Sequence, residues 1–331
     1  PMMAPLSLLD LVPVRQGESA DTSLAASVTL AQRAERLGFR RIWYAEHHNT
    51  PTIASSATSV LIAHIAANTK TIRLGAGGIM LPNHAPLVIA EQFGTLEALH
   101  PGRIDLALGR APGTDQNTLR ALRRNPADAE RFPHDILELQ GYLSGDTLIP
   151  GVNAYPGASS NVPLYILGSS LFGARLAAVL GLPYAFASHF SPDALVQAVA
   201  LYRDEFRPSA QLAEPYILAS VNVVAADSRP EADEQFAAVR KARVKGLLAR
   251  GRSLSDEELD ELFESREGRQ VQEMLTYTAV GTSHDVATYL KWFAEISSAD
   301  ELIVVLQSPS SDARLHALEL LGTSINATLP T

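Results

Sequence analysis

Strand-like apolar segments alternate with helix-like segments along almost the whole chain, and this alternation constrains the fold more than any other feature. Eight segments have the apolar character of buried strands: 6–12, 41–45, 72–81, 103–108, 163–167, 184–187, 217–225 and 301–306. The stretches between them repeat apolar residues with a helical period, as in Leu24, Val28, Ala31 and Ala34 before Gly38. A βαβ alternation of this kind predicts a parallel sheet covered by helices on both faces.

Eight strand–helix units indicate an α/β fold closed as a single-domain (β/α)8 TIM barrel. A doubly wound open sheet is the alternative, but the glycines at 75, 77 and 78 lack the GxGxxG spacing of a dinucleotide-binding turn. No Pro/Gly/Ser-rich linker divides the sequence, so we expect one domain over residues 1–331. Two stretches exceed what a barrel needs, 144–161 and the charged 251–276, and we interpret them as functional loops or flexible insertions.

Composition excludes several classes of function. The chain has no cysteine, which rules out disulfides, thiolate metal sites, iron–sulfur clusters and a cysteine nucleophile. Its 27 Lys and Arg against 36 Asp and Glu give a net charge of −9, which argues against a nucleic-acid partner. No apolar run approaches the ~18 residues of a membrane span, and the first ten residues lack the features of a signal peptide. We therefore expect a soluble, cytoplasmic protein.

In a (β/α)8 barrel the site is built from residues that follow the strands. Glu46, His47 and His48 follow the second predicted strand. Adjacent residues on an extended segment point to opposite faces, so the two histidines are not expected to chelate one metal, and no HExxH motif accompanies them. We predict no metal site. Three glycines at 75, 77 and 78 mark either a bend of the barrel or a platform where the backbone meets a ligand.

Two further segments have the chemistry of a phosphate site. Arg110 follows the fourth predicted strand, and a guanidinium suits phosphate recognition. The sequence Gly-Ser-Ser-Leu-Phe-Gly at 168–173 follows the fifth strand and opens a helix, whose free N–H groups and positive dipole end favour an anion. Ordinary helix capping is the alternative. Because the two segments follow neighbouring strands, they could face the same phosphate.

Four motifs occur in order along the chain: AEHH at 45–48, LGAGGIMLPNHAP at 74–86, GRIDLALGRAPGTD at 102–115 and LGSSLFGARLAAVLGLP at 167–183. With these motifs the chain resembles the bacterial luciferase-like flavin-dependent monooxygenases. The resemblance implies a (β/α)8 barrel that binds reduced FMN (FMNH2) at its mouth, where O2 adds to give a flavin C4a-hydroperoxide that oxidises a small organic substrate. It also implies that a separate NAD(P)H:flavin reductase supplies the reduced flavin.

The resemblance assigns site residues position by position. His47 matches the catalytic histidine that assists proton transfer, and Gly77 and Gly78 match a pair joined by a non-proline cis peptide. The implied cofactor-binding residues are Glu46, Ala76, Gly77, Gly78, Arg110, Ser169, Ser170, Leu171, Phe172 and Gly173. The stretch 251–276 falls where the family has a mobile lid. The family also implies a homodimer, formed through the predicted helices at 55–68 and 86–99.

One departure and two alternatives qualify the resemblance. Gly109 stands where the light-emitting enzyme has a cysteine, so bioluminescence is not supported. An F420-dependent oxidoreductase and a non-catalytic flavin-binding protein are the alternative functions. Residue types alone do not identify the substrate.

Overall fold

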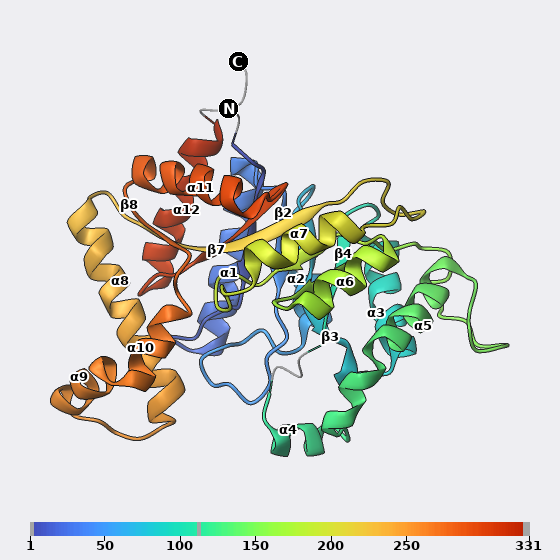
Figure 1. Cartoon of the computed structure of the whole chain (residues 1–331), viewed down its shortest axis with the longest axis horizontal. Coiled ribbons are helices and arrows are strands. Elements are labelled where there is room, and N and C mark those ends of the chain that lie inside the picture. The colour runs from blue at the N-terminus through green and yellow to red at the C-terminus, as the bar shows by residue number, and fades with distance from the viewer. Residues whose placement is uncertain (1–2, 111–113, 327–331) are drawn as a thin grey trace.

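The computed structural model describes residues 3–110 and 114–326 and shows a ring of parallel strands surrounded by helices (Figure 1). The strands are β1 (Leu6–Asp10), β2 (Arg41–Tyr44), β3 (Arg73–Met80), β4 (Ile104–Gly109), β5 (Leu164–Gly168), β6 (Tyr184–Phe186), β7 (Ile217–Ala225), β8 (Thr278–Gly281) and β9 (Glu301–Leu306). The helices are α1 (Ala20–Leu37), α2 (Thr58–Ala67), α3 (Pro86–Leu99), α4 (Gln116–Ala121), α5 (Phe132–Ser144), α6 (Leu171–Leu180), α7 (Leu195–Glu205), α8 (Arg229–Val244), α9 (Asp256–Glu264), α10 (Arg266–Glu273), α11 (Ser283–Ser297) and α12 (Ser311–Asn326). Two short 3-10 helices, η1 (Leu81–Asn83) and η2 (Pro126–Arg131), and a π-helical segment, η3 (Lys245–Ala249), complete the described elements.

The strand order confirms the predicted (β/α)8 barrel. Strands β1 to β6 pair in chain order, β6 pairs with β7, β7 with β9, and β9 returns to β1, with every pairing parallel. All eight predicted segments supply strands of this closed ring. Closure of the ring excludes the open doubly wound sheet.

Strand β8 is an addition that the sequence did not predict. It pairs with residues 222–225 of β7, whereas β6 pairs with residues 217–219. Since β9 occupies the other edge of β7, β8 extends the edge that the three-residue β6 leaves open. Its four residues, TAVG, are too few and too weakly patterned to stand out in the sequence.

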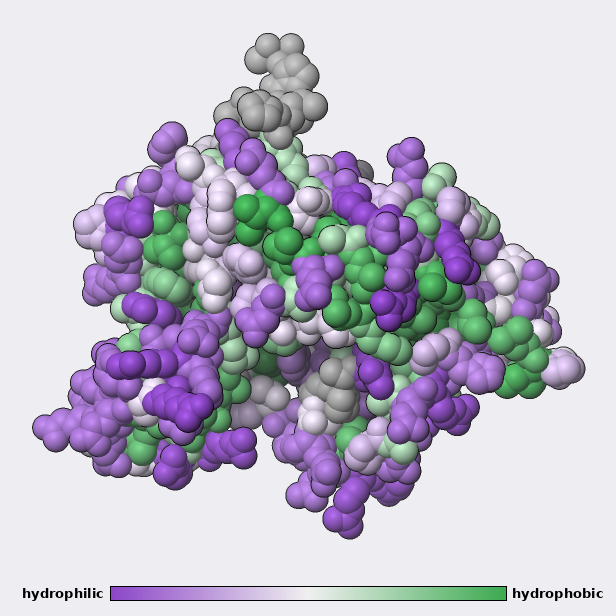
Figure 2. Space-filling model, viewed as in Figure 1, coloured by the Kyte–Doolittle hydropathy of each residue, from purple (hydrophilic) through white to green (hydrophobic). Residues whose placement is uncertain are grey.

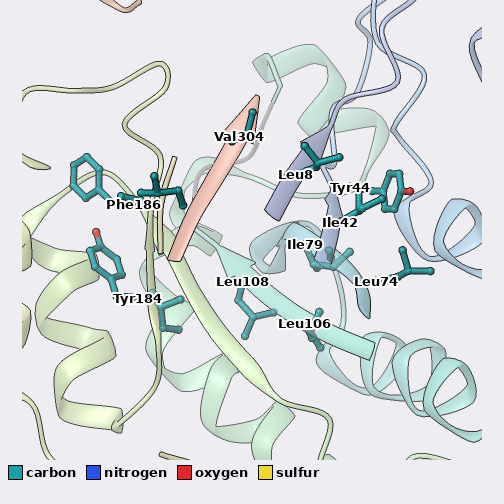
Figure 3. Packing of buried hydrophobic residues seen from close by; sticks show 14 of the residues in the cluster. Leu8, Ile42, Tyr44, Leu74, Ile79, Leu106, Leu108, Tyr184, Phe186 and Val304 are labelled. Carbon is teal, nitrogen blue, oxygen red and sulfur yellow. The ribbon is translucent and has the colours of Figure 1, made fainter. Parts of the chain in front are cut away.

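The helices pack on the outward-facing side chains of the barrel strands. Gly38 adopts the left-handed conformation, φ 89°, and ends α1 as predicted. Alternate residues of each strand, among them Leu8, Tyr44 and Phe186, are fully buried in one continuous cluster with the helices (Figure 3). This shell of apolar contacts fixes the strand ends on which the site depends.

The inward-facing side chains form layers along the barrel axis. Nearest the amino ends of the strands, Arg41 binds Asp105 at 2.9 Å and Arg73 binds the other oxygen of Asp105 at 2.7 Å. Arg41 also donates to Glu301 at 3.1 Å, so this layer contains paired charges. A second, smaller cluster covers it and consists of Trp43, Ala107, Tyr165, Ala185, Leu218 and Ile303.

The two long stretches are ordered and differ in position. Residues 145–163 connect α5 to β5 and therefore lie toward the amino ends of the strands, where Gly157 packs against Gly94 of α3. Within 251–276 the chain forms α9 and α10 rather than the unpatterned loop that its composition suggested. The ion pair of Lys241 with Asp260, at 3.3 Å, ties α9 to α8. None of the helices in the described part of the chain has the length and apolar character to cross a membrane.

Candidate active site at the barrel mouth

The carboxyl ends of the barrel strands open into a notch on the surface. The segments that follow β4 and β7 form its walls: α4 and α5 on one side, and α8, α9 and α10 on the other (Figure 1). Figure 2 shows the notch as a hollow between two hydrophilic lobes. Residues 111–113, which belong to one of the motifs quoted above, lie outside the described residues.

Alternation along β2 and the residues after it places His47 toward the barrel axis. Trp43 belongs to the inner cluster and Tyr44 to the outer one. If the same alternation continues past the strand, residue 47 points to the interior of the barrel, which we call the inner parity, and residues 46 and 48 point outward, the outer parity. The imidazole of His47 is partly buried and makes no hydrogen bond to any described side chain or backbone group. Burial, followed by the neighbouring His48, lowers the pKa of His47, so the ring is neutral at pH 7. A neutral imidazole can both accept and donate a proton.

Glu46 is buried beneath the mouth and joins the ends of two strands. It is 1% exposed, and its carboxylate contacts the Nε2 atoms of His48 and His84, each at 2.7 Å. Asn83 donates to the same carboxylate at 3.0 Å, and the backbone N–H of Met80 donates at 3.1 Å. Burial alone would raise the pKa of Glu46, but the hydrogen bonds from the two histidines outweigh it and lower the pKa to about 2. These contacts hold the segment after β3 against the segment after β2.

The backbone of β3 carries no side chain at Gly77 and Gly78, and both residues are buried. Gly77 and Gly78 are joined by a cis peptide bond, as the resemblance implied, and the β3–β4 register shifts between Gly77 and Ile79. A Cβ atom on Gly77 would lie 2.6 Å from the Cβ of Trp43, so no larger residue fits without displacing the indole. Ala76 is fully buried in the outer cluster and faces the helices. The register shift and these close contacts fit a bend of the barrel, and a platform for a ligand at the same glycines stays a prediction.

The two predicted phosphate segments meet at the start of α6. The guanidinium carbon of Arg110 lies 4.6 Å from the ring centre of Phe172, and the Nε of Arg110 donates to the carbonyl of Ala129 at 3.4 Å. Ser170 caps the helix by accepting from the N–H of Gly173 at 3.3 Å. The first N–H groups of α6, at Leu171 and Phe172, have no partner within the helix and point out of its end. The side chains of both residues are exposed.

Tyr184, which the sequence argument missed, fixes this helix start. Its hydroxyl donates to the carbonyl of Ser170 at 2.9 Å. Gly173 packs so closely that a Cβ there would lie 3.1 Å from the same hydroxyl. Ser169, which directly follows β5, is partly buried. A tyrosine on the outer face of the next strand gives no signal in the local motif, because the pairing of β5 with β6 brings it there.

A polar group formed by β7 and the segments after β6 and β9 was also missed in part. Ser220 and Asn222 alternate with apolar residues on β7 and share its inner parity with Leu218. The hydroxyl of Ser220 lies 2.8 Å from Nδ1 of His189, and Asn222 donates to the carbonyl of His189 at 2.6 Å and accepts from Gln307 at 2.9 Å. Burial, with the charges of Arg243 and His47, lowers the pKa of His189 to about 3. The period of two in SVN could have revealed these strand residues.

Metal ligation has no support in the part of the chain that the structure describes, where no group of three or more His, Asp or Glu could hold an ion. The donors around Glu46 instead satisfy one another within a single hydrogen-bonded cluster.

Comparison with known proteins places the whole chain in one group. Residues 5–298 match the model of the family described as luciferase-like monooxygenase. A protein named luciferase-like monooxygenase from Escherichia coli (strain K12) is 48% identical over 319 residues, covering 95% of each chain. N-acetyl-S-alkylcysteine monooxygenase from Bacillus subtilis (strain 168) is 31% identical, covering 98% of this chain and 99% of that protein. The crystal structure of apo-MsnO8 superposes with a TM-score of 0.86 at 32% identity, covering 99% of this chain and all of that one.

More distant solved structures share the fold with two kinds of cofactor. The oxygenating component of 3,6-diketocamphane monooxygenase from Pseudomonas putida, in complex with FMN, has a TM-score of 0.75 at 16% identity, covering 99% of both chains. An F420-dependent secondary alcohol dehydrogenase has a TM-score of 0.72 at 15% identity, covering 98% of this chain and 99% of that one. At such identities the likeness concerns the fold, and a flavin or a deazaflavin is compatible with it.

Proposed function

The chain belongs to the luciferase-like monooxygenase family, and from this premise we propose that it uses FMNH2 and O2 to oxidise a small organic substrate. When bound, reduced flavin supplies the electrons that activate O2, so the protein itself needs no redox-active side chain. The proposal includes a separate NAD(P)H:flavin reductase. Cytoplasmic location stays a prediction.

The observation that carries this proposal is the meeting of Arg110 with the start of α6. Stacking on Phe172 orients the planar guanidinium, and the amides of Leu171 and Phe172 lie at the positive end of the helix. A phosphate held here would receive charge-assisted hydrogen bonds from two elements at once. The donor set fits the phosphate of FMN, and we assign Ser169, Ser170 and Gly173 to the same cradle.

The backbone of β3 at Gly77 and Gly78 is the platform that we propose for the ring of a flavin. Both residues are buried and lack side chains, and Trp43 blocks any Cβ at residue 77. At Gly109, at the end of β4, a Cβ would lie 2.5 Å from the Cε of Met80. We therefore assign Gly77 and Gly78 to contact with the ring, and Ala76 to contact through its backbone. We assign Glu46 to holding this platform in place, since protein donors already engage its carboxylate.

His47 is the residue that we assign to proton transfer. Its ring has the inner parity, its pKa is lowered by burial, and it has no hydrogen-bond partner among the described residues. At neutral pH an unprotonated imidazole nitrogen of His47 is therefore free to accept a proton from the reacting groups and to return it. The buried surroundings of the mouth also restrict access of water to these groups.

Oxygen incorporation tests the activity directly. Purified protein, chemically reduced FMN and 18O2 are combined with a panel of small sulfides, ketones and aldehydes, and mass spectrometry follows the label. N-acetyl-S-alkylcysteines belong in the panel because the Bacillus subtilis relative is named for them. We expect one atom of 18O in a product. If no compound in a broad panel gains label although FMNH2 is bound, the monooxygenase proposal fails.

Cofactor binding tests the phosphate cradle separately. We expect Arg110→Gln to weaken FMN binding about 10- to 100-fold, the effect of losing charge-assisted hydrogen bonds. Arg175→Gln is the matched control, because Arg175 lies on α6 itself but pairs with Glu205 at 3.1 Å. Fluorescence titration with FMN and with F420 decides the cofactor. Tight binding of F420 without binding of FMN would favour the deazaflavin alternative.

Replacement of His47 separates a catalyst from a passive flavin binder. We expect His47→Ala to lower turnover by more than about tenfold, or 1.4 kcal/mol of barrier, while FMN affinity stays within about twofold. Unchanged turnover in this variant would remove His47 from the mechanism. Absence of turnover in wild-type protein that binds flavin tightly would favour the binding-protein alternative.

We also propose that two copies of the chain associate through α2 and α3. Val60 of α2 is 69% exposed and Leu99 of α3 is 62% exposed, which is unusual for large apolar side chains on helices of a barrel. Light scattering coupled to size exclusion tests this, and a monomer at micromolar concentration would contradict it.

A further inference from the structure

The hydrogen bonds around His189, in the segment that follows β6, fix which of its ring nitrogens carries the proton. Nδ1 of His189 lies 2.8 Å from the hydroxyl oxygen of Ser220, and the same hydroxyl donates to the carbonyl of Phe186 at 2.8 Å. A serine hydroxyl has one hydrogen to donate and a carbonyl oxygen can only accept, so the hydrogen of Ser220 is directed at Phe186. Nδ1 of His189 must therefore donate to Ser220, which leaves Nε2 as an unprotonated acceptor.

No described residue uses this acceptor. His189 is 8% exposed, and its Nε2 makes no hydrogen bond within the described chain. The two nitrogens of an imidazole point in diverging directions, so the bond of Nδ1 to Ser220 turns Nε2 away from β7. The ring of Phe190 holds this orientation, because it packs edge-on against the imidazole with the ring centres 4.8 Å apart. Burial is the main cause that lowers the pKa of His189 to about 3, so the ring is neutral at pH 7.

The amides of Asn222 and Gln307 present a second acceptor. Nδ2 of Asn222 lies 2.6 Å from the carbonyl of His189 and 3.4 Å from that of Tyr277, so this end of the amide is the donor. Oδ1 of Asn222 then accepts from Nε2 of Gln307 at 2.9 Å, which fixes the orientation of the Gln307 amide. Oε1 of Gln307 makes no hydrogen bond to any described residue. The group thus leaves two acceptors unused, Nε2 of His189 and Oε1 of Gln307.

Contacts place this group inside the barrel at its carboxyl end. Ser220 and Asn222 share the inner face of β7 with Leu218 of the inner apolar cluster, and they lie successively nearer the end of the strand. Because His189 contacts both, it lies above that cluster. In the closed ring β7 is the fourth strand from β3 in either direction, so this group occupies the part of the rim opposite to the platform proposed on β3.

A buried acceptor without a donor is costly, because it has lost the hydrogen bonds that water would supply. A ligand relieves this cost only if it brings an N–H or O–H group. A carboxylate does not fit, since its oxygens would meet the lone pairs of Nε2 and Oε1. The proposed ring platform and phosphate cradle lie on β3 and after β4 and β5, so the position across the ring is suited to the substrate.

We propose that Nε2 of His189 accepts a hydrogen bond from a neutral N–H or O–H group of the organic substrate and makes this protein select molecules that carry such a donor. Oε1 of Gln307 is the second acceptor for the same substrate. This inference rests on the proposed function, because it assigns a substrate class to the same site.

The test is equilibrium binding of two matched pairs of probes to protein saturated with oxidised FMN, measured by isothermal titration calorimetry. One pair is N-acetyl-S-benzylcysteine methyl ester and its N-methylated counterpart. The other is benzyl 2-hydroxyethyl sulfide and benzyl 2-methoxyethyl sulfide. Methylation removes the only hydrogen-bond donor of each parent. We expect the parent of at least one pair to bind wild-type protein about tenfold more tightly than its methylated counterpart.

Two variants of His189 separate the roles of its nitrogens. His189→Asn keeps an amide donor that reaches Ser220 but has no atom at the position of Nε2, so it should abolish the preference. His189→Gln brings an amide oxygen to that position and should retain part of it. His100→Asn is the control, because His100 ends α3 at the opposite end of the barrel and should leave the preference unchanged. Equal affinities within both pairs, no binding of either parent, or an unchanged preference in His189→Asn would each overturn the proposal.

Nitrogen-15 NMR of wild-type protein labelled at histidine gives a second readout, with the signals of His189 identified by their loss in either variant. We expect a protonated Nδ1 and an unprotonated Nε2, whose resonance moves upfield when a bound parent probe is added and stays in place with its methylated counterpart. A proton on Nε2 of His189 would contradict the inference.

The two proposals fail in different ways. If His189 governs the preference for donors but no 18O enters any compound, the donor site stands and the monooxygenase proposal fails. If parent and methylated compounds are oxygenated with equal efficiency, the monooxygenase proposal stands and the donor site fails.

Discussion

Glu46→Gln is the substitution whose effect the structure defines most sharply. Glu46 is 1% exposed, and its hydrogen bonds to His48 and His84 hold its pKa at about 2, below the ordinary value of 4.5. A difference of that size corresponds to about 3 kcal/mol in favour of folding with the carboxylate ionised. Because the pKa of the folded state is depressed, this stabilisation is fully present above about pH 4.5 and is lost as the pH falls toward 2. We therefore expect Glu46→Gln to lower the free energy of unfolding at pH 7 by up to about 3 kcal/mol.

The pH dependence distinguishes this mechanism from a simple packing defect. Urea unfolding at pH 7, 5, 4 and 3 should show the difference between wild type and Glu46→Gln shrinking as the pH falls. Glu46 also raises the pKa of His48, mainly through its hydrogen bond, so wild type should lose a further increment as the pH rises through that raised pKa. Glu295→Gln, on the exposed surface of α11, is the control. A difference between wild type and Glu46→Gln that stays constant from pH 7 to pH 3 would refute the reasoning.

Three further substitutions test the layers beneath the site by urea unfolding. Gly77→Ala forces its new Cβ to within 2.6 Å of Trp43, so we expect a loss of about 1–3 kcal/mol and weaker FMN binding. Gly246→Ala, which meets no atom within 4 Å, should be nearly neutral, and equal stability of the two variants would contradict this account. Asp105→Asn leaves two arginines without their shared carboxylate and should cost about 3–5 kcal/mol; a loss below 1 kcal/mol would mean that the network is dispensable. Tyr44→Phe removes a fully buried hydroxyl that has no partner among the described protein groups, so stability should stay equal or rise, and a clear loss would reveal a hidden partner.

Barrel topology explains why so much of the site could be predicted from the sequence. Once eight strands are assigned in chain order, residues that follow neighbouring strands must meet at one rim. That rule brought Arg110 together with the start of α6, and the contact of Arg110 with Phe172 confirms the predicted proximity. The cis bond between Gly77 and Gly78 was also predicted, through the family motif. The roles of these residues in binding a cofactor stay predictions.

The parts that could not be predicted depend on contacts between distant segments. Alternation alone places Glu46 and His48 on one face, but the second histidine on Glu46 comes from residue 84, after a different strand. Strand β8 exists because β6 ends after three residues and leaves an edge of β7 unpaired, which no local pattern reveals. The helices α9 and α10 looked unpatterned because none of the residues of α9 is fully buried. The sequence signal for such a helix is its capping box, here Ser255 with Glu258, and not a stripe of apolar residues.

The distribution of charge along the barrel axis bears on the proposed cofactor site. At the amino ends of the strands, Arg41 and Arg73 are balanced by Asp105 and Glu301, so this layer contributes no net charge. The apolar cluster around Trp43 separates it from the mouth. At the mouth the carboxylate of Glu46 lies on the outer face and is engaged by two histidines, whereas the inner face presents neutral groups. Arg110 stacks on Phe172 at the start of α6 and forms no ion pair with any described residue. A protein with a net charge of −9 thus keeps a cation at this helix start, which is the arrangement expected if the cofactor brings an anion to it.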